Sequence, residues 1–71
     1  MIKPGKYRHY KGNEYEVVGL ATHSETLEDM VVYRPLCGEG RTWVRPAVMW
    51  EERVEVGGRM VKRFERVEGE G

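Results

Sequence analysis

Four consecutive residues, His23-Ser24-Glu25-Thr26, combine an imidazole, two hydroxyls and a carboxylate, which are the groups that nucleophilic hydrolysis uses. A serine nucleophile needs a base within hydrogen-bond reach, and that base needs a group that orients it. Because adjacent side chains on an extended chain point apart, His23 and Ser24 cannot readily serve each other. We therefore interpret the segment as a polar loop at the rim of a binding surface, with a small hydrolase using His23 and Glu25 as the weaker alternative.

The residues that bind metals in proteins are few in this chain. His9, His23 and Cys37 could in principle supply three zinc ligands, but their spacings match no metal signature. A single cysteine also excludes an internal disulfide. The sequence therefore predicts no metal site, no cofactor and no catalytic residue, and hence a protein that is not an enzyme.

The aromatic residues offer a better candidate site, because several of them neighbour arginines. Tyr7-Arg8, Tyr33-Arg34 and Trp43-Val44-Arg45 can form a stacking and hydrogen-bonding surface. The alternative is that most rings fill a small core, which we favour for Tyr15, Trp50 and Phe64. The predicted binding residues are, in chain order, Tyr7, His9, Tyr33, Trp43 and Arg45, with the His23 to Thr26 loop as their rim.

The elements that must position these residues are predicted to be short strands. Alternation and β-forming residues indicate strands over 5–10, 14–22, 30–34 and 42–45. Proline at position 46 is suited to starting one helical turn over 46–50. Gly57-Gly58 lies between two alternating runs, 53–56 and 59–64, a pattern typical of a tight hairpin that makes 59–64 the last expected strand.

Five to six short antiparallel strands in 71 residues must curl to cover their apolar face. The prediction is a single all-β domain over 1–64, a small SH3-like barrel with one short helical turn before the last hairpin. Residues 65–71 carry little that is apolar, and we expect them to form a frayed polar tail. No apolar run is long enough to span a membrane, and the N-terminal residues do not form a signal peptide, so we expect a cytoplasmic protein that does not bind membranes.

The net charge is zero, since twelve Lys and Arg residues balance twelve Asp and Glu residues. The two signs are nevertheless separated: residues 1–13 hold four bases and no acid, and residues 14–29 hold five acids and no base. Opposite signs on neighbouring segments favour charge pairing across adjacent strands. The alternative is a basic face and an acidic face, each directed at a partner.

Several blocks of the sequence, in order, resemble a family of small bacterial proteins known as domain of unknown function 1653. The blocks are Pro4-Gly5-Lys6-Tyr7-Arg8-His9-Tyr10-Lys11-Gly12, His23-Ser24-Glu25-Thr26, Val31-Val32-Tyr33 and Trp43-Val44-Arg45-Pro46. The resemblance extends from Pro4 to about Phe64 and implies an SH3-like β-barrel. It implies no activity, substrate or catalytic residue.

The function that these observations favour is a non-catalytic binding module that recognises a peptide or protein through the aromatic and basic residues. A barrel that binds RNA or single-stranded DNA is the alternative, although nucleic-acid-binding domains are usually basic overall. A homodimer is a further alternative, because a core this small is often completed by a second copy and an open strand edge offers a route.

Overall fold

A computed structural model describes residues 2–38 and 40–67, which form seven strands and one short helix. The elements, in chain order, are β1 (Gly5–His9), β2 (Glu14–Thr22), β3 (Asp29–Pro35), β4 (Trp43–Pro46), α1 (Ala47–Trp50), β5 (Arg53–Val56), β6 (Arg59–Lys62) and β7 (Phe64–Arg66). The all-β class, the antiparallel strands and the helical turn before the last hairpin are confirmed.

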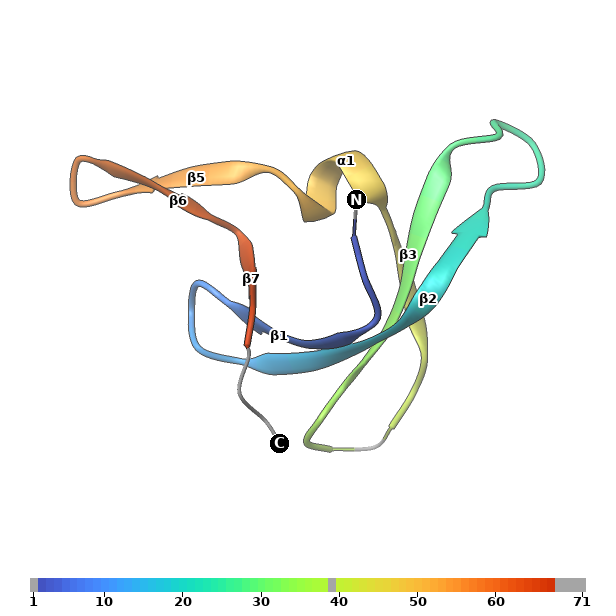
Figure 1. The fold of residues 1–71 in the computed structure, drawn as a ribbon, viewed down its shortest axis with the longest axis horizontal. Helices are drawn as coiled ribbons and strands as arrows, with labels where there is room; N and C mark the ends of the chain where they lie inside the picture. The colour runs from blue at the N-terminus through green and yellow to red at the C-terminus, as the bar shows by residue number, and fades with distance from the viewer. Residues whose placement is uncertain (1, 39, 68–71) are drawn as a thin grey trace.

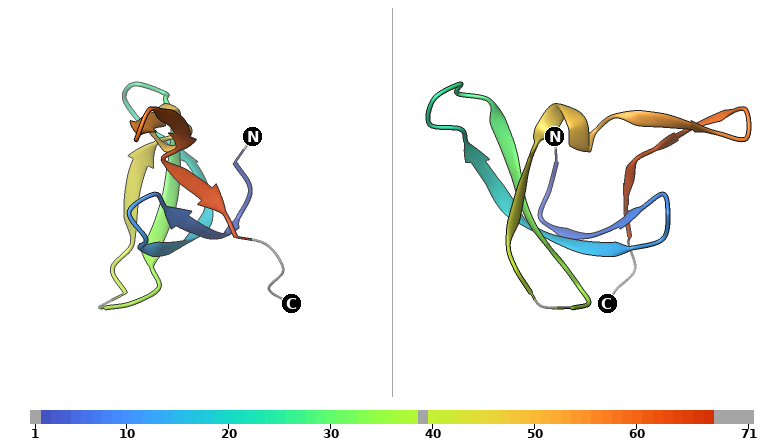
Figure 2. Two further views of the ribbon diagram at one scale, coloured as in Figure 1. Left: turned by 90° about the vertical axis from the view of Figure 1, so that its left-hand side faces the viewer. Right: turned by 180° about the vertical axis from the view of Figure 1, so that it is seen from behind.

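The strands form two sheets. The larger has the order β4-β3-β2-β1-β7, and the smaller is the β5-β6 hairpin. Figures 1 and 2 show the larger sheet curling so that its concave face encloses the space below α1. Among the described residues no strand pairing joins the two sheets, so the closed barrel of the prediction is not found.

The number of strands also differs from the prediction, because the expected last strand is divided at Arg63. The backbone N–H of Arg63 donates to Glu52 O at 3.0 Å, whereas Arg63 O accepts from the N–H of Tyr10 at 2.9 Å. The chain therefore leaves β5 at this residue and joins β1, giving seven strands instead of five to six. Residues 65 and 66 belong to β7, so they are paired where we expected a frayed tail, and 68–71 lie outside the described residues.

The turn between β5 and β6 has the predicted form. Gly57 and Gly58 have φ angles of 58° and 83°. A two-residue hairpin turn with positive φ at both central positions matches the right-handed twist of its strands, and glycine adopts it without steric cost. The hairpin register that follows places Arg53 directly opposite Lys62.

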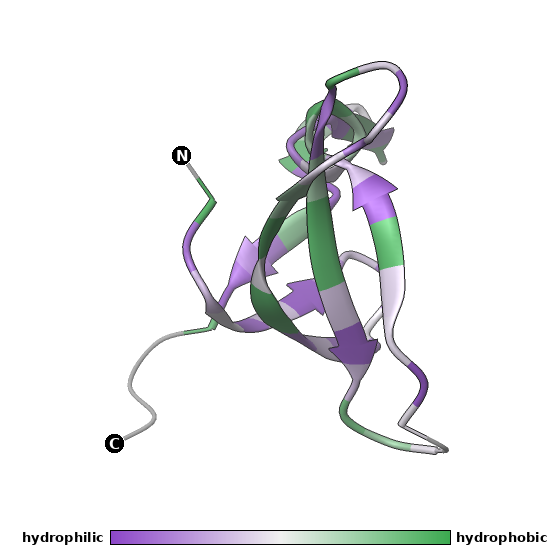
Figure 3. Cartoon of the chain, turned by 90° about the vertical axis from the view of Figure 1, so that its right-hand side faces the viewer, coloured by the Kyte–Doolittle hydropathy of each residue, from purple (hydrophilic) through white to green (hydrophobic). Residues whose placement is uncertain are grey.

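The core lies on the concave face and is centred on Trp50, which is only 2% exposed. The Trp50 ring stacks on Phe64 with centroids 3.7 Å apart and planes 2° from parallel. Tyr7 and Tyr33 contact the same indole at 5.6 Å and 4.9 Å. Trp50 and Phe64 are thus core residues, as predicted, and the middle of β3 is hydrophobic in agreement with this packing (Figure 3).

The convex face carries pairs of opposite charges between neighbouring strands. Arg8 donates to Glu14 at 3.0 Å, and Arg34 donates to Glu16 at 2.8 Å. Lys6 also lies opposite Glu16 in the β1–β2 register. Arg8 of the basic first segment is therefore paired across the sheet with the acidic second strand, in line with the pairing that the charge distribution favours.

No helix within residues 2–38 and 40–67 has the length and hydrophobicity that a membrane span requires.

Candidate functional site

The five strand residues predicted to bind a partner share the concave face of the large sheet. In an antiparallel sheet, directly opposite residues point to the same side, and so do residues two apart on one strand. Tyr33 lies opposite both Val17 and Trp43, while Arg45 lies opposite Val31. Tyr7 likewise lies opposite Tyr15, and His9 lies opposite Phe64. All five side chains therefore project from the face that holds the core.

Their accessibility divides them into two groups. Tyr7 and Tyr33 are each 7% exposed, so their rings are part of the core. Trp43 is 49% exposed, and His9 and Arg45 are half-buried. We call His9, Tyr33, Trp43 and Arg45 the Arg45 surface. The buried Tyr33 ring lies beneath this surface, and the other three residues supply its accessible groups.

Arg45 is the central cation of this surface. Its guanidinium carbon lies 5.5 Å from the centroid of the Phe64 ring and 5.9 Å from that of Tyr33, within the range of a cation–π contact. Within the described part of the chain its Nε is buried without a hydrogen-bond partner, and it forms no ion pair. The guanidinium group is therefore held against two rings while its charge stays available to an anion.

His9 lies at the edge of the same rings. Its centroid is 4.9 Å from that of Phe64, and its Nδ1 accepts a hydrogen bond from the backbone N–H of Lys11 at 3.1 Å. This bond requires an unprotonated Nδ1, so the proton of the neutral ring is on Nε2. Burial and the positive charges of Arg63, Lys11 and Arg45 lower the pKa of His9 below its ordinary value of 6.5. The surroundings of this ring are accordingly cationic.

The His23 to Thr26 loop is not part of this assembly. It lies at the tip of the β2–β3 hairpin, apart from β1 and β7 (Figure 1). His23 Nδ1 accepts the backbone N–H groups of Glu25 and Thr26 at 3.1 Å and 3.2 Å, and the Thr26 hydroxyl donates to Glu28. These bonds engage the imidazole in closing the loop, as expected of a polar turn, and they leave Nδ1 without a free lone pair for Ser24.

A second feature of the concave side is a pocket of about 370 Å³, which we call the hairpin pocket. Its wall combines core rings with charged residues from the last three strands. It is lined by Ile2, Tyr7, Trp50, Glu51, Arg53, Lys62, Phe64 and Arg66. The predicted binding residues include only Tyr7 from this set. For Arg53 and Lys62 the sequence does hold a signal, because counting outward from the two-glycine turn Gly57-Gly58 places them opposite each other.

Among the described residues, no group of three or more His, Cys, Asp or Glu side chains could hold a metal ion. Cys37 is a free, exposed thiol in the turn after β3.

The fold and these two surfaces define a small all-β protein with a curled sheet and an aromatic core. Residues 5–66 match the family described as protein of unknown function (DUF1653), and the chain belongs to that family. A crystal structure of a protein of this family from Bordetella bronchiseptica is similar to this chain, with 38% identity and a TM-score of 0.82. The match covers 97% of this chain and 95% of that one. A comparison with curated proteins gave no match.

Proposed function

We propose that this protein is a non-catalytic binding module, with its curled sheet as an SH3-like scaffold, that recognises an acidic peptide segment of a partner protein through the Arg45 surface. The observation that carries this proposal is the position of Arg45. Its guanidinium group lies over two rings at 5.5 Å and 5.9 Å and has no acidic partner among the described residues. A peptide carboxylate can accept two parallel N–H bonds from such a group.

The residues around Arg45 support an acidic peptide as the ligand. Lys11 and Arg63 add positive charge near His9; among the described residues Arg63 is paired with Glu52 at 3.1 Å, and Lys11 forms no ion pair. Trp43 lies on the same face and is 49% exposed, so it can pack against an apolar residue of the peptide. An aromatic anchor beside an unpaired arginine is the combination that dominates many protein–protein contacts.

The charge distribution disfavours the nucleic-acid alternative. Arg8 of the basic first segment is paired with Glu14, and Lys6 lies opposite Glu16. A continuous basic stripe for a phosphate backbone therefore does not extend along β1. The His23 to Thr26 loop stays outside the proposed contact because its hydrogen bonds lie within the loop.

The proposal is tested with an array of short peptides that pair an apolar residue with Asp, Glu, Asn or Gln. We expect the wild-type protein to prefer the acidic peptides, and Arg45→Ala to lose at least ten-fold in affinity, about 1.4 kcal/mol. Trp43→Ala should weaken all peptides that carry the apolar residue. Arg34→Ala is the matched control, because Arg34 is a paired arginine on the convex face.

The same two variants, used to capture partners from a cell lysate, should lose the proteins that wild type retains. Equal capture by wild type and by Trp43→Ala/Arg45→Ala would contradict the proposal. A gel shift of single-stranded RNA or DNA at low salt that Arg45→Ala abolishes, without any peptide preference, would replace the proposal by the nucleic-acid alternative.

A further inference from the structure

The hairpin pocket is a second site with a different set of cations from the Arg45 surface. Its volume of about 370 Å³ is within the range of cavities that hold small molecules. The buried side chains of Ile2, Tyr7, Trp50 and Phe64 form its apolar wall. The Nε1 of Trp50 is buried without a hydrogen-bond partner within the described residues. The pocket therefore offers apolar contact area to a ligand.

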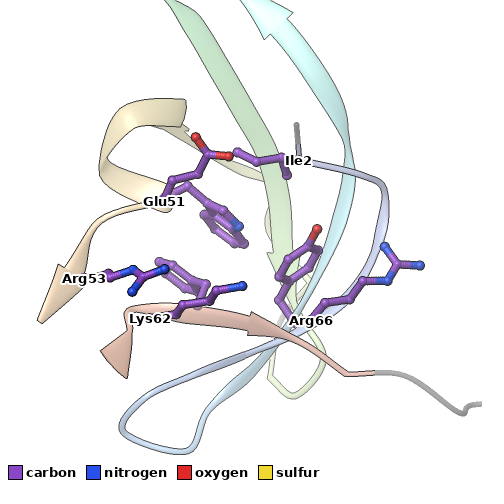
Figure 4. A pocket seen from close by; sticks show the side chains of 8 residues that line it. Ile2, Glu51, Arg53, Lys62 and Arg66 are labelled. Atoms are coloured by element: carbon purple, nitrogen blue, oxygen red, sulfur yellow. The ribbon is translucent and has the colours of Figure 1, made fainter. Parts of the chain in front are cut away.

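Two cations meet at one side of this pocket. Arg53 and Lys62 are directly opposite each other in the β5–β6 ladder, and both line the cavity. Figure 4 shows both side chains on the same side of the pocket, with the Lys62 ammonium group extending toward its middle. Like charges placed opposite each other in a ladder destabilise a hairpin. Neither residue forms an ion pair among the described residues, so an anion bound between them would relieve this repulsion.

The other charged residues of the pocket lie at different parts of its rim. Arg66 is on the opposite side, with its Nη1 donating to Pro4 O at 2.9 Å. The Glu51 carboxylate lies on the side of Ile2, away from Lys62 (Figure 4). The anion position is therefore beside Arg53 and Lys62, and the rest of the ligand would lie against the rings.

We propose that the hairpin pocket binds a small phosphate monoester with an apolar or aromatic body, its phosphate held by Arg53 and Lys62 and its body lying on the accessible edges of Tyr7 and Phe64. A phosphate monoester carries a charge of about −1.5 to −2 at pH 7, which matches two adjacent cations better than a carboxylate with a single charge. Its several acceptor oxygens can bond a guanidinium and an ammonium group together. This inference does not depend on the peptide proposal, because it uses neither Arg45 nor Trp43.

The test uses phenyl phosphate as the probe and ¹H–¹⁵N spectra of the full chain as the readout. The two indole N–H resonances are assigned with Trp43→Phe, so that Trp50 reports the pocket alone. We expect phenyl phosphate to shift the Trp50 indole resonance and to bind at least ten-fold more tightly than benzoate. Inorganic phosphate should bind at least ten-fold more weakly than phenyl phosphate, because it has no body to contact the rings.

Variants at the rim locate the phosphate. Lys62→Gln and Arg53→Gln should each weaken the binding of phenyl phosphate about ten-fold or more, whereas Glu51→Gln should strengthen it only slightly, because the Glu51 carboxylate lies on the other side of the rim. Arg59→Gln is the matched control, since Arg59 is an exposed cation of the same hairpin that does not line the pocket. Thermal unfolding confirms that each variant is folded.

Three outcomes would overturn the inference. Phenyl phosphate and benzoate binding equally would remove the argument from charge. Equal affinity for inorganic phosphate and phenyl phosphate would mean that contacts between the ligand body and the rings of the pocket add nothing to binding. Undiminished affinity in both Lys62→Gln and Arg53→Gln, with a loss in Arg59→Gln, would place the anion elsewhere on the hairpin. Loss of peptide binding in Arg45→Ala with phenyl phosphate binding intact would leave this inference standing while the two sites are shown to be separate.

Discussion

The convex and the concave sides of this protein use the same residue types in different ways. On the convex side, Arg8 and Arg34 each lie within 3.0 Å of a glutamate on the neighbouring strand. On the concave side, Arg45, Arg53 and Lys62 have no acidic partner among the described residues, and each lies beside aromatic rings or lines a pocket that contains them. The cations of the convex side are therefore paired with acids, whereas these three cations of the concave side form no ion pair among the described residues.

This difference has an energetic meaning. A pair of exposed opposite charges contributes about 0–1 kcal/mol to stability and requires no further partner. A cation held beside rings without an acid contributes its charge to the local potential, which attracts anions. The binding that we propose accordingly lies on the concave side, where aromatic side chains also build the core. The predictions below test whether the two sides differ in these ways.

The largest effect is expected from the two tryptophans of the concave side. Trp50 is 2% exposed and contacts three rings, whereas Trp43 is 49% exposed. Removal of a buried tryptophan side chain costs about 3–5 kcal/mol, so Trp50→Ala should unfold most of this small domain at room temperature. Trp43→Ala should cost less than about 1 kcal/mol. Urea unfolding followed by far-UV circular dichroism measures both.

Equal destabilisation by the two variants would show that Trp43 is part of the core and would remove the accessible aromatic residue from the Arg45 surface. Trp50→Phe is a milder comparison, since it keeps a ring stacked on Phe64 and should cost less than Trp50→Ala.

A smaller effect on the free energy of unfolding is expected from the protonation of His9 at low pH. Its pKa in the folded protein is lowered by burial and by Arg63, Lys11 and Arg45, so the unfolded chain binds the proton more readily. The stability contributed by neutral His9 is fully present above pH 6.5 and is lost as the pH falls through the lowered pKa. His9→Asn keeps an acceptor near the Lys11 N–H and removes the titrating group.

The measurement is the free energy of unfolding at pH 7.5 and pH 5.5 for both proteins. We expect wild type to lose more stability than His9→Asn between these two pH values. A peptide bound at Arg45 adds negative charge near the ring and should raise the pKa of His9 in an NMR titration. If wild type and His9→Asn lost the same free energy of unfolding between pH 7.5 and pH 5.5, the surroundings of His9 would not lower its pKa.

The strand arrangement was largely predictable from the sequence, because it follows from local patterns. Two adjacent glycines between alternating runs predict a hairpin, because a two-residue hairpin turn requires the positive φ angles that Gly57 and Gly58 adopt. The helical turn follows from Pro46 and the apolar residues after it. The division of the last strand at Arg63 was not predictable, since it depends on hydrogen bonds to Glu52 and Tyr10, which no local pattern reports.

The candidate sites were predictable only in part, and for a physical reason. Register places Tyr7, His9, Tyr33, Trp43 and Arg45 on one face, but it does not say which of them the curl of the sheet covers. The hairpin pocket needs residues from the N-terminal segment, α1 and the last three strands at once. Those contacts arise from the curl, so sequence periodicity alone cannot identify them.

The smallest effect gives the most direct comparison of the two sides. Arg34→Gln removes a convex cation that lies 2.8 Å from Glu16, so the free energy of unfolding should fall by about 0.2–1 kcal/mol at low salt. Lys62→Gln removes a cation opposite Arg53 and should raise it by a few tenths of a kcal/mol, because like charges opposite each other destabilise a hairpin. Both changes should shrink at 0.5 M salt, where the Debye length is only about 4 Å. Changes of the same sign would mean that Lys62 has an acidic partner in solution, in which case the hairpin pocket has no surplus charge to offer an anion.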